Sequence, residues 1–130
     1  MPLFRNVSSP STNNRPQEST RGPAGLAAAL GAKRAGIEAV LLIERDKILG
    51  GILNQCIHDG FGLFLFEETI TGPEYAEQLI DQLIQEKVDY MTNTMVLDLD
   101  ANRILKINSP DGYQILQAKA VILAMGCRER

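Results

Sequence analysis

A glycine-rich helix start, followed about twenty residues later by an acid, is the feature that most constrains how this chain folds. Gly22-Pro23-Ala24-Gly25 opens a stretch rich in Ala and Leu, which predicts a helix over Pro23–Gly36. Ala39–Ile43 is an apolar run typical of a strand, and Glu44 follows it. Pro suits the first turn of a helix and Gly suits its end. This order of elements is typical of the second half of a dinucleotide-binding βαβ unit.

The segment before these glycines does not resemble the strand that such a unit needs. Asn14–Arg21 is polar, and Thr20 occupies the position of the first glycine. Residues 6–20 contain a single valine among polar residues and prolines, so they bury too little apolar surface to offset the entropy of ordering. We therefore expect residues 1–21 to be disordered, and the globular part, residues 22–130, to lack its first strand.

A second helix and a long connection are predicted in the middle of the chain. Arg45–Thr71 is a glycine-rich connection with one short helix around Ile52–Ile57. Thr71-Gly72-Pro73-Glu74 is a helix start. The buried stripe that extends this helix to about Lys87 consists of Tyr75, Leu79, Leu83 and Ile84.

The last forty residues or so predict only strands and turns. Turn residues separate the apolar runs at Ala101-Asn102 and at Ser109-Pro110-Asp111-Gly112. Ala120–Ala124 is a continuous apolar run, which predicts a buried strand of the parallel type. The other predicted strands are Val88–Met91 and a three-stranded antiparallel meander at Met95–Leu99, Arg103–Asn108 and Tyr113–Ala118. The fold class is therefore α/β.

Composition excludes several function classes. A formal net charge of -3 and a pI near 5.1 argue against nucleic acid or an anionic membrane as partner. No apolar run is long enough to span a bilayer, and the N-terminal segment has no apolar signal core. Two cysteines without a disulfide framework favour the reducing cytoplasm. One histidine and two distant cysteines predict no metal site.

Four segments together resemble the FAD-dependent pyridine nucleotide-disulfide oxidoreductase family: Gly22–Ala29, Ile43-Glu44-Arg45, Gly50-Gly51 and Ile122–Gly126. The segment Gly50–Gly62 resembles more narrowly the bacterial NAD(P)/FAD-dependent oxidoreductases of that group. The resemblance covers residues 22–130. It implies a partial FAD/NAD-linked reductase domain, Rossmann-like with a parallel sheet, that corresponds to the first part of the FAD domain.

The resemblance implies a set of FAD-binding residues. Unpaired N–H groups and the positive dipole end at a helix start suit a pyrophosphate, and Gly22 would let the backbone approach it. Glu44 would accept hydrogen bonds from the adenosine ribose hydroxyls. Arg45 would either contact the adenine or stay in solvent, and Val96 would contact the adenine, fill the core, or do both. The full implied set is Gly22, Pro23, Ala24, Gly25, Glu44, Arg45, Gly50, Gly51, Val96, Ala124 and Gly126.

Two further residues are candidates for chemistry at the flavin. Disulfide reductases of this family carry a paired cysteine motif after the position of Gly50-Gly51, but here Cys56 follows alone, and Cys127 lies far along the chain outside that motif. Cys56 is either a redox thiol near the flavin or a small buried hydrophobe. His58 is either a proton donor, because histidine titrates near neutrality, or a structural residue. Obligatory dithiol chemistry is therefore not expected.

The function that the resemblance implies is electron transfer from NAD(P)H through FAD to an unidentified acceptor. Two alternatives stay open at this point. The chain is a non-catalytic remnant or a nucleotide-binding module without turnover, or it is a subunit whose site is completed by an oligomer or another chain. FAD is the expected cofactor, and NAD(P)H is expected in the full-length family.

Overall fold

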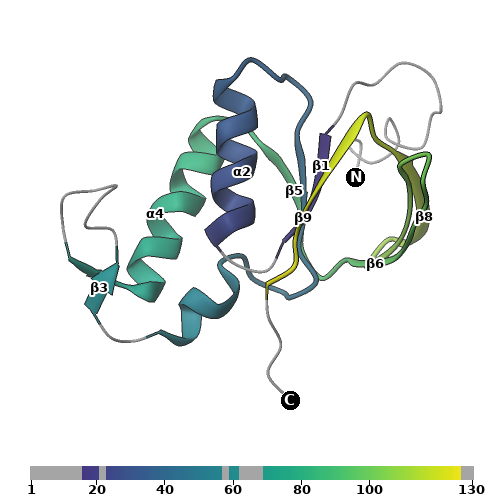
Figure 1. The fold of residues 1–130 in the computed structure, drawn as a ribbon. Coiled ribbons are helices and arrows are strands. Elements are labelled where there is room, and N and C mark those ends of the chain that lie inside the picture. Colours follow the sequence, from purple (N-terminus) through teal and green to yellow (C-terminus); the bar gives the residue numbers. More distant parts are fainter. Residues whose placement is uncertain (1–15, 21–22, 57–58, 62–68, 127–130) are drawn as a thin grey trace.

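The computed structural model describes residues 16–20, 23–56, 59–61 and 69–126, which form three layers (Figure 1). A parallel sheet lies in the middle. Two helices cover one of its faces, and a three-stranded antiparallel sheet lies on the other side. The α/β class, the parallel sheet and the three-stranded meander predicted from the sequence are confirmed.

The parallel sheet has the strand order β5-β2-β1-β9. Its strands are β1 (Pro16–Thr20), β2 (Leu41–Ile43), β5 (Asp89–Met91) and β9 (Ala120–Ala124). β1 pairs in parallel with both β2 and β9, so Ser19 lies between Ile43 on one side and Leu123 on the other. The strand that the sequence appeared to lack is therefore a central strand of the sheet.

The expectation of disorder is wrong for Pro16–Thr20, and the reason lies in the main chain. Side-chain hydrophobicity was the basis of the prediction, whereas a parallel ladder is built from backbone N–H and C=O groups. β2 and β9 each offer such groups to β1 along their length. Pro16 stands at the first position of the strand, where a missing N–H is tolerated. The rest of the expected disordered segment, residues 1–15 and 21, lies outside the described residues.

Two helices cover one face of the sheet. Helix α2 spans Pro23–Arg34 and ends in a turn where Gly36 adopts φ 95°, as its sequence predicted. Helix α4 spans Gly72–Gln85. The Arg34 guanidinium donates to Glu86 Oε1 (2.7 Å, from Nε) and thereby joins the C-terminal ends of the two helices.

Part of the predicted stripe on α4 is wrong. Leu79 and Leu83 are buried as predicted, and Tyr75 is half-buried. Ile84 is 55 % exposed, because its side chain lies on the solvent side of the helix. Adjacent residues of a helix face different directions, so Ile84 does not share the buried face of Leu83 although both side chains are apolar.

The connection between β2 and α4 contains more structure than predicted. The expected short helix is present as the 3-10 helix η1 at Gly51–Gln55. A two-stranded sheet, β3 (Asp59–Phe61) with β4 (Ile70–Thr71), was not predicted. Strands of two or three residues are too short to show a periodic pattern in the sequence.

Two hydrophobic clusters lie on opposite faces of the sheet, and β2 contributes to both. Leu42 points to the helices, while Leu41 and Ile43 point to the meander, as the alternation of a strand requires. The helix-side cluster contains Leu26, Ala29, Leu30, Val40, Leu42, Leu49, Leu79, Leu83 and Val88. The meander-side cluster contains Leu41, Ile43, Met91, Leu105, Ile107, Leu116 and Ala118.

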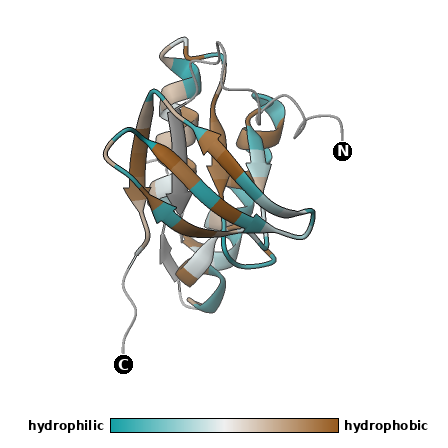
Figure 2. Ribbon diagram, turned by 90° about the vertical axis from the view of Figure 1, so that its right-hand side faces the viewer, coloured by the Kyte–Doolittle hydropathy of each residue, from teal (hydrophilic) through white to brown (hydrophobic). Residues whose placement is uncertain are grey.

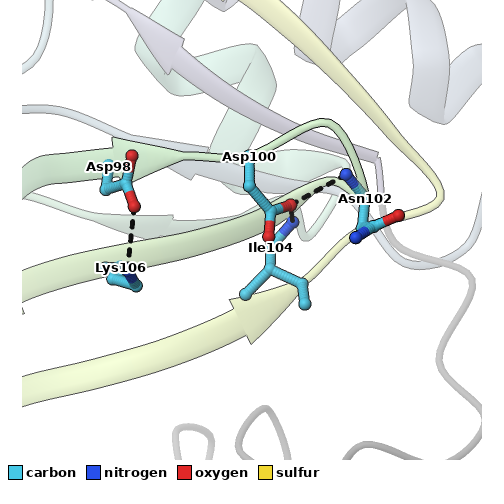
Figure 3. Close-up of polar contacts among 5 residues, drawn as sticks. All are labelled: Asp98, Asp100, Asn102, Ile104 and Lys106. Carbon is cyan, nitrogen blue, oxygen red and sulfur yellow. Dashed lines mark hydrogen bonds and ion pairs between the residues drawn. The ribbon is translucent and has the colours of Figure 1, made fainter.

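The meander consists of β6 (Met95–Leu99), β7 (Ile104–Ser109) and β8 (Gly112–Gln117). Between β6 and β7, Asp100 Oδ1 accepts from the N–H groups of Asn102 (2.8 Å) and Ile104 (3.0 Å), which closes the turn (Figure 3). On the same pair of strands Lys106 Nζ lies 2.9 Å from Asp98 Oδ2. This hydrogen bond and the lysine charge hold the pKa of Asp98 below its ordinary value.

β9 is parallel as predicted, but it is not buried. Ile122 is 42 % exposed and Leu123 is 57 % exposed. Only one neighbour, β1, pairs with β9 within the described part of the chain. Figure 2 shows the hydrophobic colouring of this strand at the rim of the molecule, beside the mixed outer face of the meander.

Candidate nucleotide-binding site

The carboxyl ends of the parallel strands meet along one edge of the sheet. From β1 the chain passes through α2 to β2 on one side, whereas β9 lies on the other side of β1. The order of connections thus reverses at β1. In open α/β sheets ligands bind in the crevice outside the strand ends at such a switch point.

Helix α2 begins directly above this switch point. β1 ends at Thr20 and α2 begins at Pro23, so only two residues separate the strand end from the helix start. Gly25 is buried in the first turn, while Ala24 is exposed. Gly22 lies outside the described residues.

The starts of the two helices differ in charge. The first turn of α4 contains an acid, Glu74, whose carboxylate accepts from the Thr71 N–H (2.8 Å), and Thr71 Oγ1 accepts from the Glu74 N–H in return. The first turn of α2 contains no acid, and its basic residues Lys33 and Arg34 are in the last turn. The positive end of the α2 dipole therefore faces the switch point without an acidic side chain from its own first turn.

Glu44 follows β2 at the same edge of the sheet and is fully buried, with a relative exposure of 0 %. A buried carboxylate needs hydrogen bonds to offset its desolvation. Glu44 Oε1 accepts from the N–H of Asp46 at 2.9 Å, which turns the chain back at this point. Glu44 therefore lies at the end of β2, where the sequence predicted an acid.

The loop after β5 holds the backbone around Glu44. The Glu44 N–H donates to Met91 O (2.8 Å), and the Thr94 N–H donates to Glu44 O (3.0 Å). The Asn93 N–H donates to Asp46 O at 2.7 Å. Thr94 is buried, and its hydroxyl donates to Thr92 O at 2.9 Å. These bonds fix the segment that carries the carboxylate.

The sequence did not reveal Asp46, Asn93 or Thr94 as supports of the site. The one local signal was Asn93, because asparagine tolerates the left-handed backbone that this residue adopts (φ 50°). Hydrogen bonds between two loops that are distant in the sequence cannot be predicted from the residues of either loop alone.

Arg45 follows Glu44 at the end of β2. Its side chain is partly exposed, and its Nε lies 3.8 Å from Asp46 Oδ1. Both roles expected for Arg45, contact with the adenine and a position in solvent, stay predictions.

Gly50 and Gly51 both adopt a left-handed backbone, with φ 107° and 53°. A Cβ on Gly50 would lie 2.8 Å from Asn54 Nδ2 and 2.9 Å from Ala76 Cβ. The glycine therefore lets η1 pack closely on α4. This close approach is a structural reason for Gly50, in addition to the ligand contact expected from the sequence.

The remaining implied binding residues lie on the meander side and on β9. Val96 is partly buried and packs against the meander-side cluster, so it has the core role that the sequence allowed. Ala124 ends β9 opposite Thr20 of β1. Gly126 follows just beyond the end of β9, and its φ of 67° is in the left-handed region.

Cys56 and His58, the two candidates for flavin chemistry, stay predictions. Cys56 is half-buried, and its thiol donates to Ile52 O at 3.4 Å. His58 lies outside the described residues. Within the described ranges no group of three or more His, Cys, Asp or Glu side chains is placed to hold a metal ion. The same part of the chain contains no helix that is long and apolar enough to cross a membrane.

Comparisons with known proteins agree with this geometry. Over 114 residues the chain is 32 % identical to a thioredoxin reductase of Mycolicibacterium smegmatis. The aligned region is 84 % of this chain and 33 % of that protein. The chain is 28 % identical to the hydrogen cyanide synthase subunit HcnB of Pseudomonas protegens, covering 84 % of this chain and 24 % of the relative. The crystal structure of Lactococcus lactis thioredoxin reductase superimposes with a TM-score of 0.70 at 28 % identity, covering 92 % of this chain and 37 % of that one.

The chain thus spans about a third or less of the length of the curated relatives it matches. The family model described as pyridine nucleotide-disulphide oxidoreductase matches residues 21–130, which is most of the chain. The chain therefore belongs to the pyridine nucleotide-disulphide oxidoreductase family.

Proposed function

We propose that residues 16–126 form the nucleotide end of the FAD site in a flavoprotein oxidoreductase that transfers electrons from NAD(P)H to an acceptor. Members of the family use FAD and NAD(P)H. The observation that supports the proposal best is the buried Glu44 carboxylate at the end of β2, one strand away from the start of α2. Both lie at the edge where β1, β2 and β9 end.

The residues present fit the nucleotide half of FAD. Backbone N–H groups at the start of α2 suit the diphosphate, because that helix end carries a positive dipole and no acid. The Glu44 carboxylate suits the ribose hydroxyls. Thr20 departs from the glycine usual at the end of the first strand. When bound, the flavin would supply the hydride chemistry, and this chain would supply binding and orientation.

A nucleotide-binding module without turnover is the second candidate. Thr20 in place of the first glycine favours it, since the usual glycine permits the tight turn at this point. In this second candidate, a partner chain or a second copy of this chain would complete the site. We place the protein in the reducing cytoplasm on the basis of its two cysteines.

Calorimetric titration of the purified protein with FAD tests the proposal. We expect saturable binding that Glu44→Ala weakens by about 1.5–3 kcal/mol, the range for a hydrogen bond to a charged group. Glu44→Gln keeps an acceptor for the Asp46 N–H and removes the charge, so it separates ribose binding from folding. The matched control is Glu77→Gln on the exposed face of α4.

The proposal is refuted if FAD shows no saturable binding, or if both Glu44 variants bind as tightly as the original chain while remaining folded by circular dichroism. Oxidation of NADH or NADPH with a dye acceptor and added FAD then distinguishes the two candidates. A rate above the free-flavin blank indicates an enzyme, and its absence in a chain that binds FAD indicates a module.

A further inference from the structure

A buried hydroxyl group closes the loop between β5 and β6. Thr94 is 1 % exposed, and its Oγ1 donates to Thr92 O at 2.9 Å. The residue between them, Asn93, is exposed and adopts a left-handed backbone with φ 50°. A hydroxyl that bonds to a neighbouring backbone carbonyl holds the chain in a local turn of this kind. The Thr94 side chain therefore fixes the shape of the loop.

This loop is hydrogen-bonded to the backbone on both sides of Arg45. The Thr94 N–H donates to Glu44 O (3.0 Å), and the Asn93 N–H donates to Asp46 O (2.7 Å). Both donors belong to the turn that the Thr94 hydroxyl closes. Backbone groups that pair in this way restrict the freedom of both segments. The shape of the β5–β6 loop therefore determines where residues 44–46 lie.

The same hydrogen bonds orient the Glu44 carboxylate. Glu44 Oε1 accepts from the Asp46 N–H at 2.9 Å, and the carbonyl of Asp46 is held by the loop. Glu44 is fully buried, so its charge depends on donors in fixed positions. A binding group is effective when its own hydrogen bonds already hold it in the geometry that the ligand needs. The Thr94 hydroxyl is thus linked to the carboxylate through the bond from Asn93 to Asp46.

We infer that Thr94 is a positioning residue whose hydroxyl sets how well the site distinguishes a ribose with its hydroxyl groups from one that lacks them. This inference rests on the proposed function, in which Glu44 accepts hydrogen bonds from the adenosine ribose. Loss of the Thr94 hydroxyl lets the loop relax, and the carboxylate is then held less firmly in the orientation that the ribose needs. Ribose recognition thereby depends on a loop about fifty residues beyond the acid that makes the contact.

Calorimetric titration of the purified protein with ADP and with 2′,3′-dideoxy-ADP tests the inference. ADP represents the adenosine diphosphate part of FAD, and the dideoxy compound lacks both ribose hydroxyls. The measured quantity is the ratio of the two dissociation constants. In the original protein we expect ADP to bind about 10- to 100-fold more tightly, the range for hydrogen bonds to a charged group. Glu44→Gln should lower this ratio, because it removes the charge.

Thr94→Val keeps the shape of the side chain and removes the hydroxyl, so it should lower the ratio about three- to tenfold. The affinity for dideoxy-ADP should change less than about twofold, because that ligand has no hydroxyl for Glu44 to bind. Thr94→Ser keeps a hydroxyl and should keep the ratio of the original protein.

The matched control is Asp100→Ala, which removes two hydrogen bonds from the turn at the opposite end of β6 (Figure 3). It should lower the melting temperature and leave the ratio unchanged. Asn93→Ala is a second test variant if Thr94→Val does not fold by circular dichroism. Asn93 is exposed, and alanine disfavours its left-handed backbone, so this variant should also lower the ratio.

A folded Thr94→Val or Asn93→Ala protein that keeps the original ratio would overturn the inference. An equal fall of the ratio in Asp100→Ala would overturn it too, because any loss of stability would then have the same effect. Absence of saturable ADP binding, or a ratio that Glu44→Gln leaves unchanged, refutes the proposed function and this inference with it. A ratio that falls in Glu44→Gln but not in Thr94→Val refutes this inference alone.

Discussion

β2 and β9 are both short aliphatic strands that pair with β1 in the same direction, yet one is fully buried and the other is exposed. Leu41, Leu42 and Ile43 of β2 are at most 2 % exposed. β2 has β5 as a second neighbour, helices on one face and the meander on the other. β9 has no second neighbour among the described residues, and Leu123 is 57 % exposed. Burial of a parallel strand is thus a property of its surroundings rather than of its composition.

Truncation of one side chain in each strand gives the largest expected difference. Leu42→Ala removes a fully buried side chain from the helix-side cluster and should cost about 2–5 kcal/mol of unfolding free energy. Ile122→Ala in the protein alone should change it by less than about 0.5 kcal/mol. Urea unfolding followed by circular dichroism measures both. Equal losses would show that β9 is as well covered as β2.

Helix α4 covers β2, and its packing depends on a glycine at the start of the helix. A Cβ on Gly72 would lie 2.3 Å from Leu53 O and 2.6 Å from Cys56 O, so Gly72→Ala must displace η1 or the helix. We expect a loss of about 1–3 kcal/mol, the range for overpacking.

Gly31→Ala in the middle of α2 is the matched control for that substitution. Nothing lies within 4 Å of a Cβ at Gly31, so alanine should stabilise the protein by about 0.5–1 kcal/mol through helix propensity. The two melting temperatures should therefore move in opposite directions. A Gly72→Ala protein as stable as the original would mean that α4 tolerates a shift without uncovering β2.

The smallest expected effect concerns the cap of α4. Thr71→Ala removes the side-chain acceptor of the capping box and should cost about 1 kcal/mol at neutral pH. Hydrogen bonds from the Thr71 N–H and hydroxyl hold the pKa of Glu74 below its ordinary value of 4.5. A lowered pKa means that the stabilisation by Glu74 is present above pH 4.5 and is lost as the pH falls through the lower, folded-state pKa.

Unfolding free energies of the original protein and Thr71→Ala at several pH values measure this effect. The difference between them should shrink as the pH falls below 4.5. A difference that stays constant down to acid pH would show that the hydrogen bond from the Thr71 hydroxyl to the Glu74 carboxylate contributes nothing to the cap. Titration of the Glu74 carboxyl group by NMR provides the direct check, since Thr71→Ala should raise its pKa.

Much of the architecture followed from local patterns. The glycine and proline punctuation of α2, the capping box of α4 and the alternation of the meander strands each report a local backbone preference. The position of Glu44 after β2 followed from the same kind of reasoning. The supports of Glu44 did not, because Asn93 and Thr94 act through backbone bonds between loops about fifty residues apart.

The sequence by itself determined the class of the fold, the positions of its two helices and the acid at the end of β2, because helix caps, turn residues and periodicity act within a few residues. Only the tertiary structure decided that polar Pro16–Thr20 is a central strand and that aliphatic Ala120–Ala124 is an exposed edge. Backbone groups pair without regard to side-chain polarity, and burial depends on which neighbours are present. Neither property can be read from the residues of the strand alone.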